Sequence, residues 1–220
     1  MALHHSPRIV TNGLVLALDA ASIRSYPMSG TTWYDLSGNN KNFAINMTTQ
    51  PTFLENSLQF QNQGGYRANV LSADILTDMT IECWYKPISM NNACCGTVFG
   101  TGQFQFFHIG NYVYMMIGVD NGSGTRLWMH PQFFLENNIW HHVVLCRRNK
   151  QYYVIWVDGV EVYISEAYSG LNLWTNKDDW YVSETTHPNV KISSCRAYNR
   201  ALSSTEILQN YNATKSKYGL

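Results

Sequence analysis

The chain has 220 residues, of which 45% are hydrophobic and 14% aromatic, a composition typical of a folded protein rather than a disordered one. Fifteen basic residues balance fifteen acidic ones, and this neutrality argues against nucleic acid as the main partner, because such binding requires clustered basic residues. No segment approaches the roughly 20 apolar residues of a membrane span, and residues 1–12 lack the pattern of a signal peptide, so we expect no membrane partner.

Short apolar or alternating segments follow one another along the chain, separated by clusters of Gly, Asn, Asp, Ser and Pro, a pattern that predicts many antiparallel strands. After an N-terminal arm over residues 1–12, the predicted strands are Gly13–Ala20, Ser57–Phe60, Tyr66–Val70, Met79–Lys86 (ending at Pro87), Thr97–Phe99, Phe104–Ile109, Tyr112–Val119, Thr125–His130, Trp140–Arg147, Tyr152–Val157, Val160–Ser165, Trp180–Val182 and Val190–Ala197. Asp158-Gly159 is the signal of a type I′ hairpin turn, which needs positive φ at both central residues. The spacing predicts a sandwich in a single domain over residues 1–220.

One helix is predicted near the end of the chain, over residues 203–212. Ser203 suits the N-cap, and Glu206 three residues later completes a capping box. Leu202 and Ile207 stand at the two positions of a hydrophobic staple. The tail over residues 213–220 is expected to stay mobile unless a partner orders it.

The five cysteines are an odd number without any CxxC pair, so a zinc ribbon or a thioredoxin-type site has no support. We expect reduced thiols, with Cys83, Cys146 and Cys195 acting as small apolar strand residues. A reactive Cys94–Cys95 pair is the disfavoured alternative, because nothing nearby in the sequence would lower a thiol pKa.

Several segments together resemble the laminin-G-like, concanavalin A-like jelly-roll family. They are GLVLALDA from Gly13, Trp33–Asn40, MTIECWYKP from Met79, NIWHHVV from Asn138, YVIWVDGVEV from Tyr153, and ISSCRAYNRALSSTEILQNY from Ile192. The resemblance implies two packed antiparallel sheets, one of them usually concave. The expected fold is therefore all-β, a two-sheet antiparallel jelly-roll sandwich with one short C-terminal helix.

The amino-acid sequence of the last segment and of the tail NATKSKYGL is similar to that of domains in structural proteins of tailed bacteriophages. This similarity implies a virion protein made in the cytoplasm of a bacterial host. Its partners would then be other virion proteins, further copies of itself, or a host glycan.

The sequence contains no recognisable catalytic pattern. Some concanavalin-like enzymes use two carboxylates at alternate positions of one strand, but Glu82 is alone in its strand. His141 and His142 face opposite sides of a strand, so they cannot share one ion, and we expect one imidazole packed at the sheet and the other near solvent. No GxSxG nucleophile motif occurs. We expect a protein that is not an enzyme.

Calcium is the one cofactor for which the sequence offers ligands, in the segment DLSGNN. Asp35 and Asn39 carry hard oxygen atoms of the kind that calcium prefers. The favoured alternative is an Asx-type turn, in which these side chains satisfy local backbone groups.

Aromatic side chains supply the remaining candidates for binding. Between Tyr112 and Val119 both alternating sets are apolar, which predicts a strand buried on both faces. A contact surface for a sugar or a protein is predicted at Arg126, Trp128, His130, Trp174 and Trp180. The sequence thus favours a non-enzymatic virion surface protein, in capsid decoration or associated with the tail. The alternative is a lectin-like module that binds host surface glycans.

Overall fold

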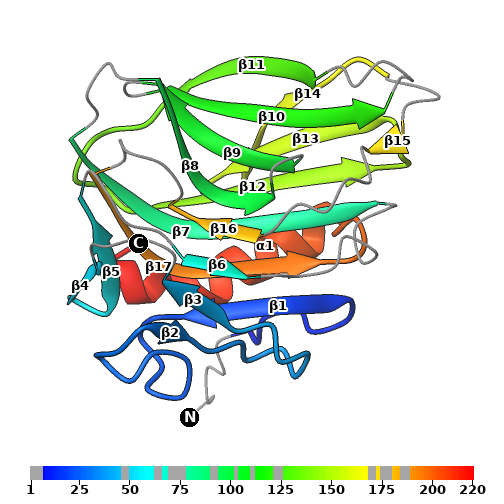
Figure 1. Ribbon diagram of the computed structural model, residues 1–220. Helices are drawn as coiled ribbons and strands as arrows, with labels where there is room; N and C mark the ends of the chain where they lie inside the picture. Colours follow the sequence, from blue (N-terminus) through cyan, green and yellow to red (C-terminus); the bar gives the residue numbers. More distant parts are fainter. Residues whose placement is uncertain are drawn as a thin grey trace, which may run out of the picture.

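Two stacked antiparallel sheets make up the molecule (Figure 1). The computed structural model describes residues 7–45, 50–61, 66–68, 78–89, 94–101, 104–109, 112–120, 126–167, 172–173, 180–183 and 189–220. The predicted fold class, a two-sheet antiparallel jelly-roll sandwich with one short C-terminal helix, is confirmed.

The first sheet has eight strands, and its long central strands lie side by side. In spatial order they are β14 (Val160–Ile164), β13 (Tyr152–Val157), β12 (His141–Arg148), β7 (Met79–Ser89), β17 (Asn189–Tyr198), β5 (Ser57–Phe60) and β4 (Thr52–Leu54), with β1 (Leu14–Asp19) also paired to β17. The turn between β13 and β14 has φ of 50° at Asp158 and 81° at Gly159, as the predicted type I′ turn requires.

The second sheet has nine strands. In spatial order they are β11 (Arg126–Phe134), β10 (Tyr112–Asp120), β9 (Phe104–Ile109), β8 (Cys94–Thr101), β16 (Trp180–Val182), β6 (Tyr66–Ala68), β3 (Phe43–Ile45) and β2 (Thr32–Trp33), with β15 (Asn172–Leu173) also paired to β10. The expectation that the strand from Tyr112 to Val119 is buried on both faces is wrong at Tyr112, which is 41% exposed, while Val113 is buried.

The main core lies between the sheets, and alternate residues of each strand enter it. In β7, Ile81, Cys83 and Tyr85 face this core, while Glu82 and Trp84 face the other way. Each large apolar side chain that is fully buried contributes about 1.5–3 kcal/mol.

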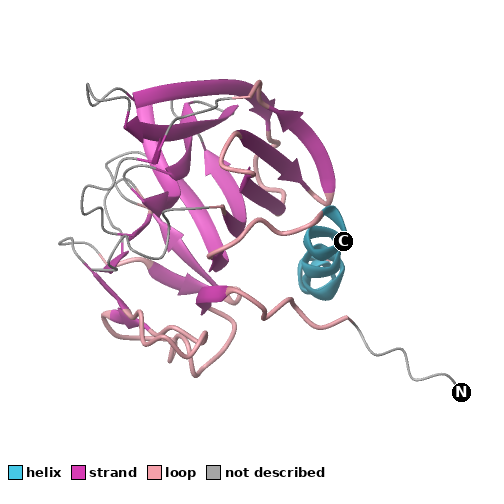
Figure 2. Ribbon diagram, turned by 90° about the vertical axis from the view of Figure 1, so that its right-hand side faces the viewer, coloured by secondary structure: helices cyan, strands magenta, loops and turns pink. Residues whose placement is uncertain are grey.

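The helix α1 (Ser204–Thr214) covers the outer face of the first sheet (Figure 2). The predicted capping box between Ser203 and Glu206 is confirmed, with both reciprocal hydrogen bonds present. Leu202 and Ile207 pack together with Val144 and Val154 of the sheet in a second hydrophobic cluster. The first sheet is therefore covered on both faces, by the second sheet and by the helix.

The tail corrects one prediction. After α1 the chain continues into a 3-10 turn, η2 (Lys215–Tyr218), whose Tyr218 ring stacks on Trp84 with 4.1 Å between ring centroids. Lys217 forms an ion pair with Asp19 at 3.1 Å. Contacts within the chain thus hold the tail that was expected to be mobile.

The end of strand β7 differs from the prediction at Pro87. Strand β7 was predicted to end there, yet it runs on to Ser89, with Pro87 paired to Val190 of β17. A proline lacks the N–H that a central strand position needs. The ladder to β12 ends at the Tyr85–His141 pair, so Pro87 has a single neighbouring strand and loses little.

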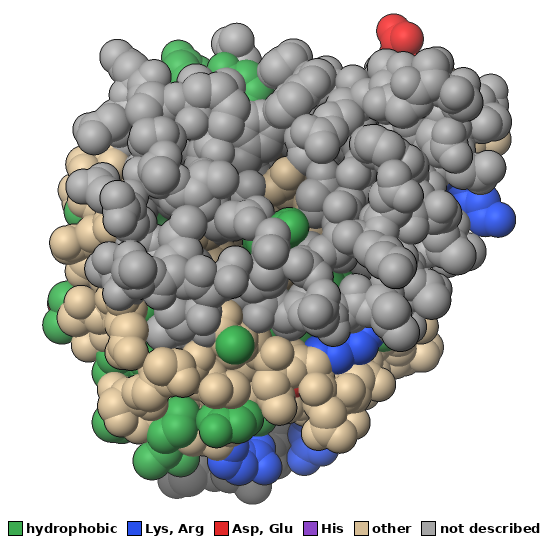
Figure 3. All heavy atoms as spheres, in the orientation of Figure 1, with side chains coloured by type: hydrophobic (Ala, Val, Ile, Leu, Met, Phe, Trp, Pro, Cys, Tyr) green, Lys and Arg blue, Asp and Glu red, His purple; other side chains and the backbone are tan. Residues whose placement is uncertain are grey.

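The N-terminal arm lies beside the helix over its described residues. The Val10 amide donates to Asn210 Oδ1 at 2.8 Å, and Gln209 Nε2 donates to the Arg8 carbonyl at 2.6 Å. No helix among the described residues has the length and hydropathy of a membrane span. On the face drawn in Figure 3, few of the described side chains are charged, in keeping with the 14% of charged residues in the sequence.

Three cysteines lie where the sequence predicted small apolar residues. Cys83, Cys146 and Cys195 are free thiols in the buried parts of β7, β12 and β17. Burial raises the pKa of the Cys83 and Cys146 thiols, which makes them poor nucleophiles. The side chains of Cys94 and Cys95 lie outside the described residues.

Candidate ligand-binding pocket

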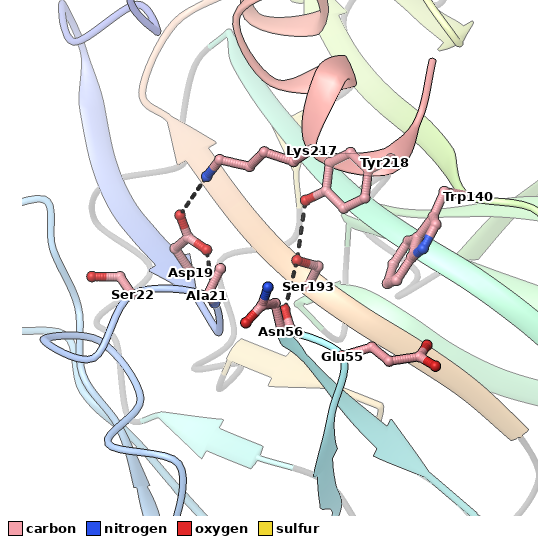
Figure 4. A pocket seen from close by; sticks show the side chains of 9 residues that line it. All are labelled: Asp19, Ala21, Ser22, Glu55, Asn56, Trp140, Ser193, Lys217 and Tyr218. Carbon is pink, nitrogen blue, oxygen red and sulfur yellow. Dashed lines mark hydrogen bonds and ion pairs between the residues drawn. The ribbon is translucent and has the colours of Figure 1, made fainter.

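A pocket of about 430 Å³ opens where η2 approaches the β4–β5 turn and the segment after β1 (Figure 4). Its walls come from parts of the chain that are distant in sequence: Asp19, Ala21, Ser22, Glu55, Asn56, Trp140, Ser193, Lys217 and Tyr218. Pockets of about 300–1,000 Å³ are typical of small-molecule sites.

Aromatic rings form one side of this pocket. Trp140, just before β12, is partly buried, and its ring centroid lies 4.9 Å from that of Tyr218 at an angle of 47°. Burial raises the pKa of Tyr218 to about 12, so its hydroxyl stays protonated, and it lies 3.1 Å from Ser193 Oγ. These contacts fix the two rings and leave part of the indole exposed.

Trp84 of β7 supports the Tyr218 ring from the side of the sheet. Its indole Nε1 donates to Thr214 Oγ1 at 2.8 Å, which ties the end of α1 to β7. Its ring stacks on Tyr218 and also on His142, with 5.0 Å between centroids. The pocket wall therefore depends on a packed layer beneath it.

Polar groups line the other sides. The Asp19 carboxylate pairs with Lys217 and also accepts from the Ala21 amide at 3.0 Å. Ser193 Oγ donates to the Asn56 carbonyl at 3.0 Å. Within the described residues, the Asn56 side-chain amide and the Ser22 hydroxyl have no partner, so they are free to bind a ligand.

The β4–β5 turn is strained where it enters the pocket. Glu55 and Asn56 have φ of 53° and 58°, the left-handed conformation of a type I′ turn. Asparagine tolerates this conformation, whereas an ordinary residue such as glutamate pays about 1–2 kcal/mol for it. Strain of this kind is concentrated at functional sites.

Glu55 is held by a lysine of the neighbouring sheet strand. Its Oε2 lies 2.7 Å from Lys191 Nζ. This hydrogen bond and the positive charge lower the pKa of Glu55 below its ordinary value. The carboxylate is therefore ionised at neutral pH.

A buried ionic network lies under α1 near the pocket. Glu82 Oε1 accepts from Arg196 at 2.6 Å, and Glu82 Oε2 accepts from Asn210 at 3.0 Å. Burial alone would raise the pKa of Glu82, but the attraction of Arg196 and the nearby His142 outweighs it and holds this pKa at about 2. Burial lowers and Glu82 raises the pKa of Arg196, with a net rise, so both groups stay charged.

The two neighbouring histidines lie on opposite faces, as predicted, but neither is near solvent. His142 is fully buried beneath α1, and its Nε2 lies 3.4 Å from Glu82. His141 is 9% exposed, and its Nδ1 lies 2.8 Å from the Asp158 carboxylate. The β13–β14 turn thus covers the ring that was expected to be near solvent.

Of the five residues predicted to form a contact surface, three lie on one strand. Arg126, Trp128 and His130 stand at alternate positions of β11, the edge strand of the second sheet. Trp180 is 1% exposed and packs on Phe99 in the main core, which corrects the expectation that its ring lies at a surface. Trp174 lies outside the described residues.

Asp35 and Asn39 form the expected Asx-type turn. Asp35 Oδ1 accepts from the amides of Ala17 and Ser37, and Asp35 Oδ2 accepts from the Ser37 hydroxyl at 2.7 Å. The Asn39 side-chain Nδ2 donates to the Ser37 hydroxyl at 2.9 Å. In the part of the chain that the structure describes, no three His, Cys, Asp or Glu side chains lie together in a group that could hold a metal ion.

Sequence reasoning missed the residues of the pocket. Trp140 lies at the start of a predicted strand, inside the NIWHHVV segment, and Tyr218 lies in the tail, and neither was predicted to bind a ligand. An aromatic residue in a polar tail was the available signal.

The two antiparallel sheets and the capping helix define a concanavalin A-like β-sandwich. Residues 60–208 match the Laminin_G_3 family, described as the concanavalin A-like lectin/glucanases superfamily, and the chain belongs to this family. No curated protein matches the chain significantly.

Solved structures share the fold at low sequence identity. The binding domain of Paraclostridial Mosquitocidal Protein 1 has a TM-score of 0.73 and 13% identity, over 92% of this chain and 52% of that one. The binding domain of Botulinum Neurotoxin DC in complex with SialylT has a TM-score of 0.67 and 13% identity, over 92% and 52%. Trypanosoma rangeli sialidase in complex with sialic acid has a TM-score of 0.68 and 16% identity, over 93% and 33%. The chain thus spans a third to a half of these proteins.

Proposed function

We propose that this protein is a non-enzymatic carbohydrate-binding module whose sugar site is the pocket beside Trp140. The observation that carries the proposal is the combination of a partly exposed indole with a free amide, a free hydroxyl and two lysine-paired carboxylates in one cavity. Aromatic faces match the C–H surfaces of sugar rings, while polar groups bind hydroxyls.

The charge state of the pocket supports binding rather than hydrolysis. Glycosidases need one carboxyl group whose pKa is raised, so that it can donate a proton. Lysines are paired with both carboxylates of this pocket, Asp19 and Glu55, and the pKa of Glu55 is lowered. Neither group suits a general acid.

Similar structures give further support for a glycan ligand. The binding domain of Botulinum neurotoxin DC was solved with SialylT in one structure and with rat synaptotagmin II, a protein, in another. The same fold therefore carries both sugar and protein ligands in other molecules. The free polar groups of this pocket favour the sugar.

Substitution of Trp140 tests the proposal. Trp140→Ala should abolish binding to every glycan that the native protein binds on a broad array, with affinities then measured by calorimetry. The matched control is Phe134→Ala, which removes an aromatic side chain that is 59% exposed and does not line the pocket. Unchanged glycan binding by the Trp140 variant, or no binding by the native protein, would contradict the proposal.

We further propose that the module works in a bacteriophage virion, assembled in the host cytoplasm as a capsid decoration or a tail-associated protein. The similarity of the closing segment to phage structural domains supports this role. Strand β14 adds to it, because this edge strand exposes Val160 (61%), Val162 (36%) and Ile164 (51%). Exposed apolar edges favour protein contacts, with virion proteins or with a second copy.

Light scattering with calcium and with chelator tests this second role. A discrete oligomer, or capture by purified virions, is expected if β14 is a contact surface. A monomer that virions do not retain would contradict it. A mass that changes with calcium would revive Asp35 and Asn39 as ligands, whereas we expect the same mass in both conditions.

A further inference from the structure

Two lysines lie directly opposite each other next to the pocket. Lys86 of β7 and Lys191 of β17 are cross-strand partners on the outer face of the first sheet. Like charges in this position destabilise a sheet. Such a pair calls for compensation by negative charge.

Among the described residues, one carboxylate serves these two ammonium groups. Glu55 pairs with Lys191, and Lys86 contributes to lowering the pKa of Glu55. Lys86 Nζ lies 5.7 Å from the centre of the Trp140 ring and has no carboxylate partner among the described residues. The group therefore carries an excess positive charge beside the aromatic wall.

Glu55 is placed as a replaceable partner. The Lys191 side chain is only 9% exposed, whereas that of Glu55 is 62% exposed and stands on the strained turn. The ammonium is fixed by the sheet, and the carboxylate can rotate into solvent at little cost. An incoming anion could then take its position over both lysines.

We propose that the ligand is an acidic saccharide, whose carboxylate or sulfate group binds between Lys86 and Lys191 while its ring lies against Trp140. This inference rests on the proposed function and names its ligand class. Glu55 occupies the anion position in the empty protein and leaves it when the ligand binds. A neutral sugar would leave the excess charge unmatched, and it should bind more weakly.

Calorimetry with lactose, sialyllactose and sulfated lactose tests the inference on the full chain. The acidic sugars should bind about ten-fold more tightly than lactose, as expected for one additional charged hydrogen bond, and the difference should shrink at high salt. Comparison of the two acidic sugars distinguishes a carboxylate from a sulfate preference.

Variants assign the effect to the lysines. Lys86→Met should reduce the affinity for the acidic sugar to that for lactose, and Glu55→Gln should raise it, because the competing carboxylate is gone. Lys191→Met should act like Lys86→Met where it folds. Lys150→Met is the matched control, since this exposed lysine lies in the β12–β13 turn, at the opposite end of β12 from Trp140.

The outcomes separate the two proposals. Equal affinity for neutral and acidic sugars, with binding still dependent on Trp140, overturns the acidic-ligand inference and leaves the sugar site standing. Acidic preference that survives Lys86→Met also overturns it. Absence of binding to any glycan overturns both proposals.

Discussion

At the scale of single residues, Glu82 shows how a buried charge can be kept. Its side chain is 1% exposed, and each carboxylate oxygen has a donor, Arg196 on one and Asn210 on the other. Taking two charges out of water is costly, so the pair gives little net stability, but removing one partner leaves the other uncompensated.

Glu82→Gln should therefore lower the free energy of unfolding by about 3–5 kcal/mol, because the buried Arg196 guanidinium loses its counter-charge. Urea unfolding followed by circular dichroism measures this loss. Glu161→Gln, an exposed position of β14, is the control and should change stability by less than about 0.5 kcal/mol. Equal stability of the two variants would refute the role assigned to the ion pair.

The pKa of Glu82 also predicts how stability depends on pH. It is about 2 in the folded protein against an ordinary 4.5, so the folded state binds this proton less readily than the unfolded state. The stabilisation is complete above pH 4.5 and is lost as the pH falls toward 2. Since one pKa unit corresponds to about 1.4 kcal/mol, the loss amounts to about 3 kcal/mol.

Unfolding measured between pH 7 and pH 2 checks this expectation. The contact with Arg200 also holds the pKa of Glu206 at about 2, so the contribution of Glu206 to the stability of the protein is lost over the same pH range. The difference between the native protein and Glu82→Gln isolates the contribution of Glu82. A difference that stays constant over this range would show that Glu82 has an ordinary pKa.

At the scale of elements, strand β8 contains a glycine for which no other residue fits. Gly100 has φ of 144°, and a Cβ there would lie 2.3 Å from the Phe104 carbonyl oxygen of the neighbouring strand. Gly38 also has a positive φ, 92°, but a Cβ there would meet nothing within 4 Å. Both glycines have a positive φ, but only at Gly100 would a side chain also clash, so comparing the two positions isolates the cost of the clash.

Gly100→Ala should cost at least about 2 kcal/mol more than Gly38→Ala, because strand β9 must move in the first variant and nothing must move in the second. Thermal unfolding of both variants provides the comparison. Similar melting temperatures would mean that β8 and β9 yield without cost at this point.

Local sequence signals predicted the elements that depend on neighbouring residues. The Asp158-Gly159 turn and the Ser203–Glu206 capping box are set within a few residues, and both were predicted. The short strands β2, β3, β4 and β15 were missed, because two or three residues carry too little periodicity to stand out. Of these strands, β15 pairs with the distant β10, whereas β4 pairs with β5 across a short turn.

The candidate site was not predictable in the same way. Asp19, Glu55, Trp140 and Tyr218 are brought together only by the folded sandwich. Aromatic content alone led instead to Trp180, which packs in the core. Exposure, which distinguishes a ligand platform from a core residue, follows from tertiary contacts that the sequence does not display.

At the scale of the whole molecule, the last residues complete both the packing and the pocket. A chain that ends at Thr214 should melt at lower temperature and show red-shifted tryptophan emission, because Trp84 loses the stacked Tyr218 ring. It should also lose glycan binding with the pocket wall. The control removes only Gly219 and Leu220, which are exposed and line no part of the pocket. Unchanged emission of the shorter chain would contradict this role of the tail.

The place of β17 in the first sheet bears on how the protein is made. This strand contacts β7, β5 and β1, yet it follows every other described strand in the sequence, at residues 189–198. During synthesis, β1 and the β4–β5 hairpin therefore cannot join the sheet that β7, β12 and β13 form until β17 is made. The apolar faces of these strands stay uncovered until then. Long-range closure of this kind is slow, on the order of milliseconds to seconds, and exposes the nascent chain to aggregation. The first sheet should then close only after β17 has left the ribosome, and chaperones should raise the yield.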